Sequence, residues 1–370
     1  MGFSPVPHAV LQAFWRKSFG EPNTNHNMSF IGYLHRVTDG EVLSVDDAQD
    51  AMEFILNGDA TTAQIAGFAV AIKMRGEVRD EILGFAKAMR KHSFKVDIGT
   101  DETVLDTCGT GGDGSGTFNI STIAAFVVAG AGLKVAKHGG RSASGTFGSA
   151  DLLEALGVKL DLTPADSARA IREIGIGFLF APAHHPAMRH ARQARTELKM
   201  RTVFNLLGPL TNPAGAQVQL IGAPSQQAAR IMAEALCELG TQRALVVHGV
   251  DGLDEISTSG PTFVYEATEG RVRNHLWTPG DFGVPRTVLS RLIPDRNEQN
   301  IDIARNVLSG HSGPHRDIVL VNAAAALYVA GRVSDLRAGM IVAGESIDSG
   351  AARGKLEALA RFATLPSHEH

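Results

Sequence analysis

The sequence predicts a two-part α/β protein, in which a small N-terminal helical domain precedes a larger domain with a mostly parallel sheet flanked by helices. Three observations support this prediction. Apolar residues recur at helical spacing through residues 29–93, and from Thr103 onward short apolar strands alternate with helical segments. A chain of 370 residues also exceeds what a single core comfortably holds. We expect an extension at 1–27, a helical domain at 28–98 and an α/β domain at 99–370.

Residues 29–93 are predicted to form four helices. Ser44 can cap one of them, and Gly58 follows its end. Thr61 or Thr62 can cap the next, which Gly76 terminates. Their apolar faces comprise Ala48, Met52 and Ile55, then Ile65, Phe68 and Ile72, and finally Val78, Ile82, Phe85 and Met89. Stripes of this kind are typical of a bundle core.

The second part of the chain alternates between strands and helices. Apolar strands are predicted at 104–107, 133–136, 178–181 and 244–248, and helical segments at 121–131, 150–156, 165–174 and 225–239. Residues 262–266 and 271–274 form a predicted hairpin, and 317–329 a buried helix. In sheets of this class, ligands bind beyond the carboxyl ends of the strands.

A glycine-rich stretch from Asp106 to Asp151 organises the predicted site. Eleven glycines lie between Gly109 and Gly148, against 40 in the whole chain. A strand, a glycine loop and a helix beginning near Asn119 direct backbone N–H groups and the positive end of a helix dipole at one point, which favours an anion. The motif is neither a Walker loop nor a clean dinucleotide-binding fingerprint. A flexible linker is disfavoured because the loop feeds directly into an apolar helix.

Composition narrows the classes of partner. The formal net charge of −4 gives no electrostatic reason to expect nucleic acid or an anionic membrane. The longest apolar run, 120–133, is too short to span a bilayer, and residues 1–27 lack the apolar core of a signal peptide. The only cysteines are Cys108 and Cys237, which favours a reducing cytoplasm, with Cys108 as a small buried residue.

Three later stretches carry possible chemistry. The acidic loop Asp251–Glu255 follows a predicted strand, and adjacent carboxylates there suit Mg²⁺ held together with substrate phosphates. A helix after residues 180–186 carries several arginines, among them Arg195, and a basic helix is usually a solvated face. The segment 206–213 contains two prolines around a glycine and predicts a stiff turn.

Four motifs occur in the order and spacing of a known family: Gly109-Thr-Gly-Gly-Asp113, Asn119-Ile-Ser-Thr122, Lys137-His-Gly-x-Arg141 and Gly148-Ser-Ala-Asp151. From Met28 onward the chain resembles the anthranilate phosphoribosyltransferases. The resemblance implies a fold of the nucleoside phosphorylase/phosphoribosyltransferase type, with helices from about 186–206 joining the helical domain. It also implies a homodimer formed through the helical domain.

The resemblance further implies transfer of a phosphoribosyl group from phosphoribosyl pyrophosphate to anthranilate, in tryptophan biosynthesis. Two Mg²⁺ ions are expected, on Asp254, Glu255 and the hydroxyl of Ser121. Arg195 is expected on the anthranilate carboxylate, and His138 in the acceptor pocket, with no residue assigned as a general base. The implied substrate-binding residues are Gly109, Gly112, Asp113, Thr117, Asn119, Ile120, Ser121, Thr122, Lys137, His138, Gly139, Gly140, Arg141, Ser142, Ala143, Ser144, Gly145, Ser149 and Arg195.

The sequence departs from the family pattern on the acceptor side. Gly140 stands where the family has an asparagine that contacts the acceptor, and residues 144–147 replace the usual Ser-Ser-Lys-Ser. A phosphoribosyltransferase for a different aromatic amine therefore stays open as an alternative. So does an enzyme like the pyrimidine nucleoside phosphorylases, in which the Asp254–Glu255 pair would be unexpected. A non-enzymatic nucleic-acid-binding protein is disfavoured by the net charge.

Overall fold

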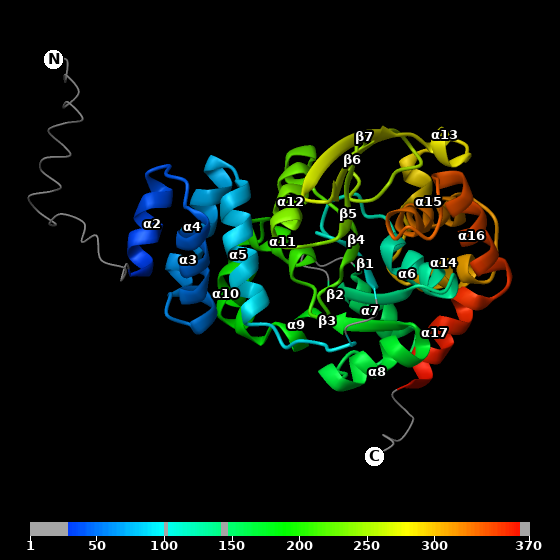
Figure 1. Ribbon diagram of the computed structural model, residues 1–370, viewed down its shortest axis with the longest axis horizontal. Coiled ribbons are helices and arrows are strands. Elements are labelled where there is room, and N and C mark those ends of the chain that lie inside the picture. The colour runs from blue at the N-terminus through cyan, green and yellow to red at the C-terminus, as the bar shows by residue number, and fades with distance from the viewer. Residues whose placement is uncertain (1–28, 100–102, 142–146, 363–370) are drawn as a thin grey trace, which may run out of the picture.

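The computed structural model describes residues 29–99, 103–141 and 147–362. Figure 1 shows a small group of helices beside a larger body built around a twisted sheet. This arrangement confirms the predicted fold class. The boundaries at 98 and 99 stay a prediction, because the cores of the two parts are partly continuous, as described below.

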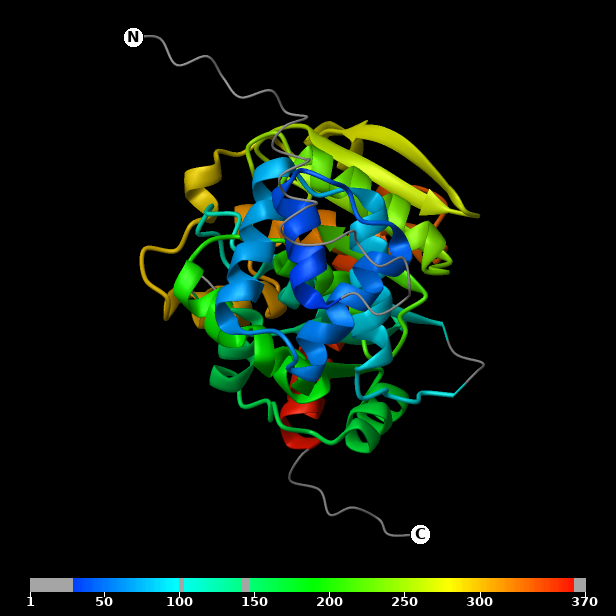
Figure 2. The same cartoon turned by 90° about the vertical axis from the view of Figure 1, so that its left-hand side faces the viewer.

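The helical part begins and ends its helices where the sequence signals predict. Residues 29–99, all described, form α2 (Phe30–Thr38), α3 (Val45–Asn57), α4 (Thr62–Arg75) and α5 (Arg79–Lys91). The Ser44 side chain accepts the Asp47 N–H at the start of α3, and Gly58 ends that helix in the left-handed conformation. Thr61 forms a capping box with Gln64 at the start of α4. Helix α10 (Arg189–Leu198), from the predicted range 186–206, packs against α4 and α3. Figure 2 shows these helices in front of the larger body.

The described residues form one seven-stranded sheet in the order β3-β2-β1-β4-β5-β6-β7. Its parallel strands are β1 (Val104–Gly109), β2 (Lys134–Gly139), β3 (Ile176–Phe180), β4 (Val218–Gly222) and β5 (Arg243–Gly249), and its antiparallel hairpin is β6 (Thr262–Thr268) and β7 (Arg271–Trp277). From the centre of the sheet, β1, β2 and β3 follow one another toward one edge, and β4 and β5 follow one another toward the other edge. The order therefore reverses between β1 and β4, where α/β sheets form their ligand crevice.

Helices cover both faces of the sheet. One face is covered by helices that include α6 (Ile120–Gly130), α15 (Pro314–Val329), α16 (Leu336–Asp348) and α17 (Ala351–Phe362). The other face packs against α12 (Gln226–Glu238), whose far side meets α5 of the helical part.

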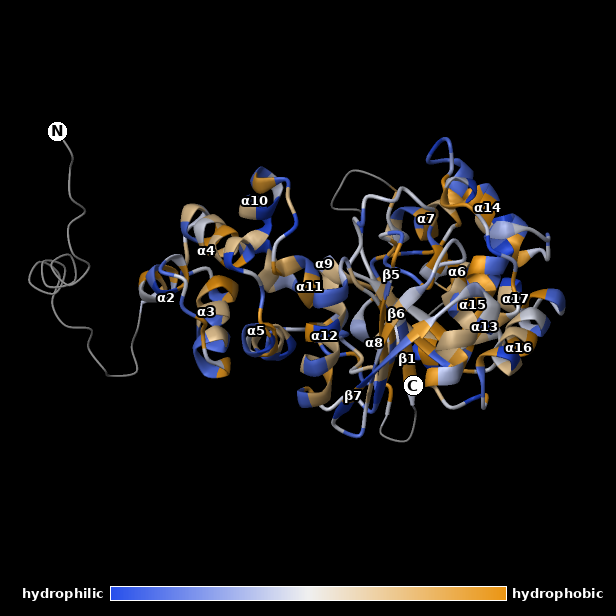
Figure 3. Ribbon diagram, turned by 90° about the horizontal axis from the view of Figure 1, so that it is seen from above, coloured by the Kyte–Doolittle hydropathy of each residue, from blue (hydrophilic) through white to orange (hydrophobic). Residues whose placement is uncertain are grey.

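The remaining helices are α7 (Ser149–Ala155), α8 (Pro164–Ile174), α9 (Ala181–His184), α11 (Phe204–Leu207), α13 (Pro279–Phe282) and α14 (Gln299–Leu308), with 3₁₀ turns η1 (Pro186–Met188), η2 (Pro209–Thr211) and η3 (Leu289–Leu292). In Figure 3 the helices α3, α12 and α16 each carry a hydrophobic and a hydrophilic side.

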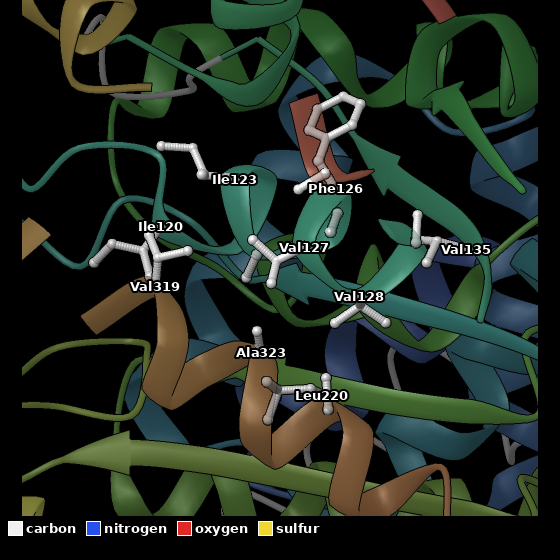
Figure 4. Packing of buried hydrophobic residues seen from close by; sticks show 14 of the residues in the cluster. Ile120, Ile123, Phe126, Val127, Val128, Val135, Leu220, Val319 and Ala323 are labelled. Atoms are coloured by element: carbon white, nitrogen blue, oxygen red, sulfur yellow. The ribbon is translucent and has the colours of Figure 1, made fainter. Parts of the chain in front are cut away.

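The two largest hydrophobic cores of the described residues lie on opposite faces of the sheet. In Figure 4, Val127 and Val128 of α6 lie on one side of Ala323 of α15 and the sheet residue Leu220, and all four belong to one buried cluster. Fully burying each such side chain contributes roughly 1.5–3 kcal/mol, so this packing fixes the position of α6 and of the loop that precedes it. On the other face, one core runs without a break from the helical part through α12 to β4 and β5. The two parts thus share buried surface near α5.

The sequence prediction differed from the structure in two elements of the sheet. Strand β4, which lies at the centre of the sheet, was not predicted, although its residues Val218–Gly222 are all buried. Strand β2 continues to Gly139, so Lys137 and His138 lie inside the strand and not after it. The predicted hairpin and the buried helix now called α15 are both present, and Cys108 is buried as expected. Among the described helices, none combines the length and apolar character needed to cross a bilayer.

Candidate active site

The acidic loop lies directly over the point where the strand order reverses. Gly109 of β1 pairs with Gly222 of β4 at this point. A Cβ atom on Gly222 would come within 1.6 Å of the Asp254 carbonyl oxygen, and one on Gly109 within 2.8 Å of Asp254 Oδ2. Only glycines at these two positions let the loop after β5 come so close to the strand ends. The sequence therefore brings the glycine loop and the acidic loop together.

Backbone donors join the two loops. Gly111 N–H donates to Asp254 Oδ2 at 3.0 Å, and Asp254 N–H donates to Asp113 Oδ2 at 3.2 Å. Ser121 N–H donates to Glu255 Oε1 at 3.1 Å, which ties the first turn of α6 to the same acidic loop. Three predicted carboxylates, Asp113, Asp254 and Glu255, thus belong to one connected group.

Within the acidic loop Glu255 is buried, whereas Asp254 is half-buried. Glu255 is only 9% exposed. Burial, followed by the nearby Asp254, raises the pKa of Glu255 to about 8, and burial together with Asp113 raises the pKa of Asp254 to about 7. The charged forms of both groups are therefore disfavoured until a cation is added.

This donor set fits Mg²⁺ held jointly by protein and substrate. The two carboxylates and the Ser121 hydroxyl are hard oxygen ligands, the kind that Mg²⁺ prefers. Among the described residues, no three His, Cys, Asp or Glu side chains converge to hold an ion by themselves. A site with few protein ligands leaves coordination positions for water and substrate phosphates, which is the usual arrangement for Mg²⁺.

The glycine loop leads into the start of α6 and leaves donors free for an anion. Gly111, Gly112, Gly114 and Gly116 all have positive φ, a conformation that glycine adopts without strain. The side chain of the N-cap residue Asn119 does not cap α6: its Nδ2 donates to the Phe147 carbonyl at 3.1 Å, and its buried Oδ1 has no partner within the described residues. Thr117 Oγ1 lies 3.1 Å from Ser115 Oγ in the same loop. An uncapped helix start of this kind favours a phosphate group.

Lys137 and two other predicted residues are buried below this loop. Lys137 is 3% exposed, and its Nζ donates to the Thr107 carbonyl oxygen. Thr122 is buried in the first turn of α6. The Ile120 side chain packs in the hydrophobic core near Val319, so only its backbone can face a ligand (Figure 4).

The acceptor side contains polar groups that lack partners. His138 Nδ1 lies 3.1 Å from the Gly208 carbonyl oxygen, which can only accept, so Nδ1 carries the hydrogen. The rings of His138 and His185 are 5.2 Å apart, and the Nε2 atom of each is buried without a partner in the described chain. Burial lowers the pKa of His138 well below its usual value, and burial with the neighbouring His184 lowers that of His185 to about 4. Both rings are therefore neutral at pH 7.

Arg195 lies on α10, beside the ring of Phe204. Its guanidinium carbon is 5.9 Å from the centre of the Phe204 ring, and burial lowers its pKa. Within the described residues it forms no hydrogen bond or ion pair. A half-buried guanidinium without a counter-ion is suited to a planar carboxylate, which it can bind through two parallel hydrogen bonds.

The remaining predicted site residues follow β2. Among the described residues, a Cβ atom on Gly140 would meet only the Ala181 Cβ, at 3.9 Å, and Gly140 is not among the residues with positive φ. Ser149 Oγ accepts the Gly140 N–H at 3.2 Å. Arg141 is paired with Asp151 and Glu154 on α7 and is half exposed, so the structure does not bring it to the acidic loop. Ser142, Ala143, Ser144 and Gly145 lie outside the described residues.

Sequence reasoning missed several residues beside the site. Asp106, Asn212 and His185 are buried next to Lys137 and His138. Arg201 Nη2 reaches Thr110 Oγ1 at 3.5 Å, and its charge acts on Asp254 and Asp113. One signal was available, because an aspartate within the apolar strand Val104-Leu105-Asp106 needs partners to be buried.

The fold and site together define a two-domain glycosyl transferase, and comparison with known proteins agrees. The family model described as "Glycosyl transferase family, helical bundle domain" matches residues 31–93, and "Glycosyl transferase family, a/b domain" matches 101–353. The anthranilate phosphoribosyltransferase of Solibacter usitatus is 56% identical over 337 residues, covering 91% of this chain and 99% of the relative. The chain belongs to the anthranilate phosphoribosyltransferase family.

Solved structures are similar over the same range. The crystal structure of the Thermus thermophilus enzyme has a TM-score of 0.85 and 43% identity, covering 91% of this chain and 100% of its own. The Saccharomyces cerevisiae enzyme in complex with PRPP and Mg has a TM-score of 0.83 and 30% identity, covering 91% of this chain and 98% of its own. The yeast enzyme has also been solved with 4-fluoroanthranilate.

Proposed function

We propose that this protein transfers the phosphoribosyl group of phosphoribosyl pyrophosphate to anthranilate, which yields N-(5-phosphoribosyl)anthranilate and pyrophosphate in tryptophan biosynthesis. One observation carries the proposal: a glycine loop and the acidic pair Asp254–Glu255 meet at the crevice of the sheet. Membership of the family and the yeast complex with PRPP and Mg support it.

The phosphoribosyl half binds the leaving group and the sugar phosphate. Positive charge develops on the anomeric carbon while negative charge builds on the departing pyrophosphate. Asp254, Glu255 and the Ser121 hydroxyl would hold Mg²⁺, with two ions expected, and when bound the metal neutralises part of the pyrophosphate charge. Lys137 and the free N–H groups of the glycine loop stabilise the same developing charge. Asn119 and Thr122, at the start of α6, bind the phosphate of the sugar.

The acceptor half orients an aromatic amine that also carries a carboxylate. Arg195 pairs with the carboxylate, and the neutral rings of His138 and His185 line the pocket. The amine already has a free lone pair, so no general base is assigned. Rate acceleration on this side comes from holding the amine in line with the anomeric carbon.

A second acceptor remains a candidate because of Gly140. The family's asparagine contact is missing there, and among the described residues only the Ala181 Cβ comes near an added Cβ, at 3.9 Å. A different aromatic amine that fills this space would bind without that hydrogen bond.

The proposal also includes a homodimer in the cytoplasm. The helical part exposes four large apolar side chains, with Ile31 47%, Val42 50%, Met74 83% and Phe94 54% exposed. Exposed apolar residues on one small domain support a protein contact there. Sedimentation of the purified protein at two concentrations tests the dimer, and a monomer at both would reject it.

A fluorescence assay tests the function. Anthranilate is fluorescent, and its signal should fall in the presence of phosphoribosyl pyrophosphate and Mg²⁺ but not when EDTA is added. A panel of other aromatic amines, followed by release of pyrophosphate, identifies the preferred acceptor. Release of free base from pyrimidine nucleosides with phosphate alone would instead identify a phosphorylase.

A further inference from the structure

We infer that Asp106 is a positioning residue, which holds His138 and the segment Gly208–Pro213 in the arrangement that the acceptor needs. The inference rests on the proposed function, because it concerns the acceptor half of the same site. Asp106 lies in β1, the neighbour of the strand β2 that carries His138. The Asp106 side chain is fully buried.

The ends of β1 and β2 are joined by side chains instead of a regular ladder. The parallel pairing of the two strands extends over Val104↔Lys134 and Leu105↔Val135, although both strands continue for several residues. Beyond that point, the Ala136 carbonyl accepts from Asn212 Nδ2 at 2.8 Å, and the His138 N–H donates to Asp106 Oδ1 at 3.1 Å. Lys137 Nζ similarly reaches the Thr107 carbonyl. Where β1 and β2 reach the site, these side-chain hydrogen bonds therefore hold the two strands in place.

Asp106 and Asn212 form the centre of this arrangement. Asn212 Nδ2 donates to Asp106 Oδ2 at 2.8 Å, and Asn212 Oδ1 accepts the Ala214 N–H at 2.9 Å. Each side-chain oxygen of Asp106 thus accepts one hydrogen bond, from β2 on one side and from the segment 208–213 on the other. The Cys108 thiol is a further donor to the same carboxylate.

The segment Gly208–Pro213 is the wall against which His138 rests. Its carbonyl groups are bonded from several directions: Gly208 O by His138 Nδ1 at 3.1 Å, Pro209 O by Gln219 Nε2 at 2.8 Å, Leu210 O by Arg90 Nε at 2.7 Å and Pro213 O by the Val96 N–H at 3.1 Å. Arg90 belongs to α5, and Val96 follows that helix. Asn212 is the residue through which β1 fixes this wall.

The chemistry requires a carboxylate at position 106. All three hydrogen-bonding neighbours are donors, and an amide of the same shape would have to turn its own NH₂ group toward one of them. A buried donor facing another donor loses a hydrogen bond and leaves both groups unsatisfied. Lys137 lies close enough to oppose the effect that burial has on the pKa of Asp106, so it also compensates the negative charge.

The first experiment measures the kinetics of Asp106→Asn. We expect the KM of the acceptor to rise about tenfold or more, because one or two buried hydrogen bonds are lost, while the KM of phosphoribosyl pyrophosphate changes less than about threefold. Glu81→Gln is the matched control. Glu81 is also fully buried and accepts the Leu43 N–H at 3.0 Å together with an Arg75 donor, but it lies in the helical part. That variant should leave both KM values near wild type.

Asn212→Ala provides an independent variant, which removes the donor to Asp106 and to Ala136. The same selective rise in acceptor KM is expected. Equal changes in both KM values, or no change in either variant, would overturn the inference. If neither variant folds, Asp106 and Asn212 hold the fold as a whole, and the inference is equally wrong.

A spectroscopic test separates this inference from the identity of the acceptor. In protein labelled with ¹⁵N-histidine, the ring signals of His138 can be assigned by their loss in His138→Gln. Asp106→Asn should shift these signals without any substrate present, whereas Glu81→Gln should not. Unchanged His138 signals in Asp106→Asn contradict the positioning role whichever amine the enzyme uses. An anthranilate assay that fails while the signals shift contradicts only the proposed acceptor.

Discussion

The two halves of the candidate site are built differently. The phosphoribosyl half consists of local motifs, a glycine loop and an acidic loop, joined by backbone hydrogen bonds such as Gly111 N–H to Asp254. The acceptor half consists of side chains from distant parts of the chain, and among the described residues the Nε2 atoms of His138 and His185 have no partner. Each loop of the first half can therefore be recognised from its own sequence, although the two meet only in the fold, whereas the second half has no such local motif. Variants should separate the halves.

The largest effect is expected from Asp254→Asn combined with Glu255→Gln. Turnover should fall by more than about a hundredfold at moderate Mg²⁺, because both proposed carboxylate ligands are lost. The fold should survive, since neutral amides relieve the burial of two charges. Steady-state kinetics and circular dichroism check this, with the exposed Asp161→Asn as control. Wild-type rates in the double variant would reject the metal assignment.

Arg195→Ala should weaken the acceptor half alone. Loss of a charged, two-point hydrogen bond to a carboxylate should raise the KM of anthranilate by about tenfold to a hundredfold, with little change for phosphoribosyl pyrophosphate. Arg192→Ala is the matched control, because Arg192 lies on the same helix but is exposed. A similar rise in both KM values would mean that Arg195 has a structural role.

Gly140→Asn should strengthen the acceptor half if anthranilate is the natural acceptor. The backbone at Gly140 does not have the positive φ that would strain asparagine, and the nearest neighbour of an added Cβ is at ordinary contact distance. A regained hydrogen bond to the ligand should lower the anthranilate KM by about tenfold. Gly354→Asn, at an open position on α17, controls for the substitution itself. An unchanged or higher KM, with another amine as the better substrate, would mean that the pocket has been reshaped.

The smallest effect concerns stability and pH in the absence of divalent metal. The folded pKa values of Asp254 and Glu255, about 7 and about 8, lie above the usual unfolded values near 4. The folded protein therefore binds more protons than the unfolded chain between pH 4 and 8, and these groups make it less stable as the pH rises through that window. Urea unfolding in EDTA at pH 5 and pH 8 should show a loss of at least about 1 kcal/mol that the double amide variant lacks. Equal slopes for both proteins would contradict the burial of the pair.

The difference between the halves also explains what could be predicted from the sequence. Helix caps at Ser44 and Thr61, and the strand–loop–helix ending in α6, follow from local rules and are present as predicted. The acidic loop was recognised, but its burial was not, because that depends on Gly222 in β4, a strand that lies more than a hundred residues from the glycine loop and was not predicted. Strand β4 shows no alternation of polar and apolar residues because both of its faces are covered.

The acceptor half was the least predictable part. The position of His138 depends on Asp106, Asn212 and Gly208, which belong to three different segments and meet only when the sheet and the connection between the two parts are assembled. The roles given to the predicted site residues, from Gly109 to Arg195, stay proposals until they are tested.

Calorimetric measurements of ligand binding test most directly whether the site has two separable halves. Phosphoribosyl pyrophosphate with Mg²⁺, and separately anthranilate in the presence of pyrophosphate and Mg²⁺, are titrated into wild type, Arg195→Ala and the Asp254→Asn/Glu255→Gln double variant. If the halves are separate, Arg195→Ala keeps its affinity for phosphoribosyl pyrophosphate and loses its affinity for anthranilate. The double variant should instead lose its affinity for phosphoribosyl pyrophosphate. Loss of both ligands in both variants would contradict the division of the site.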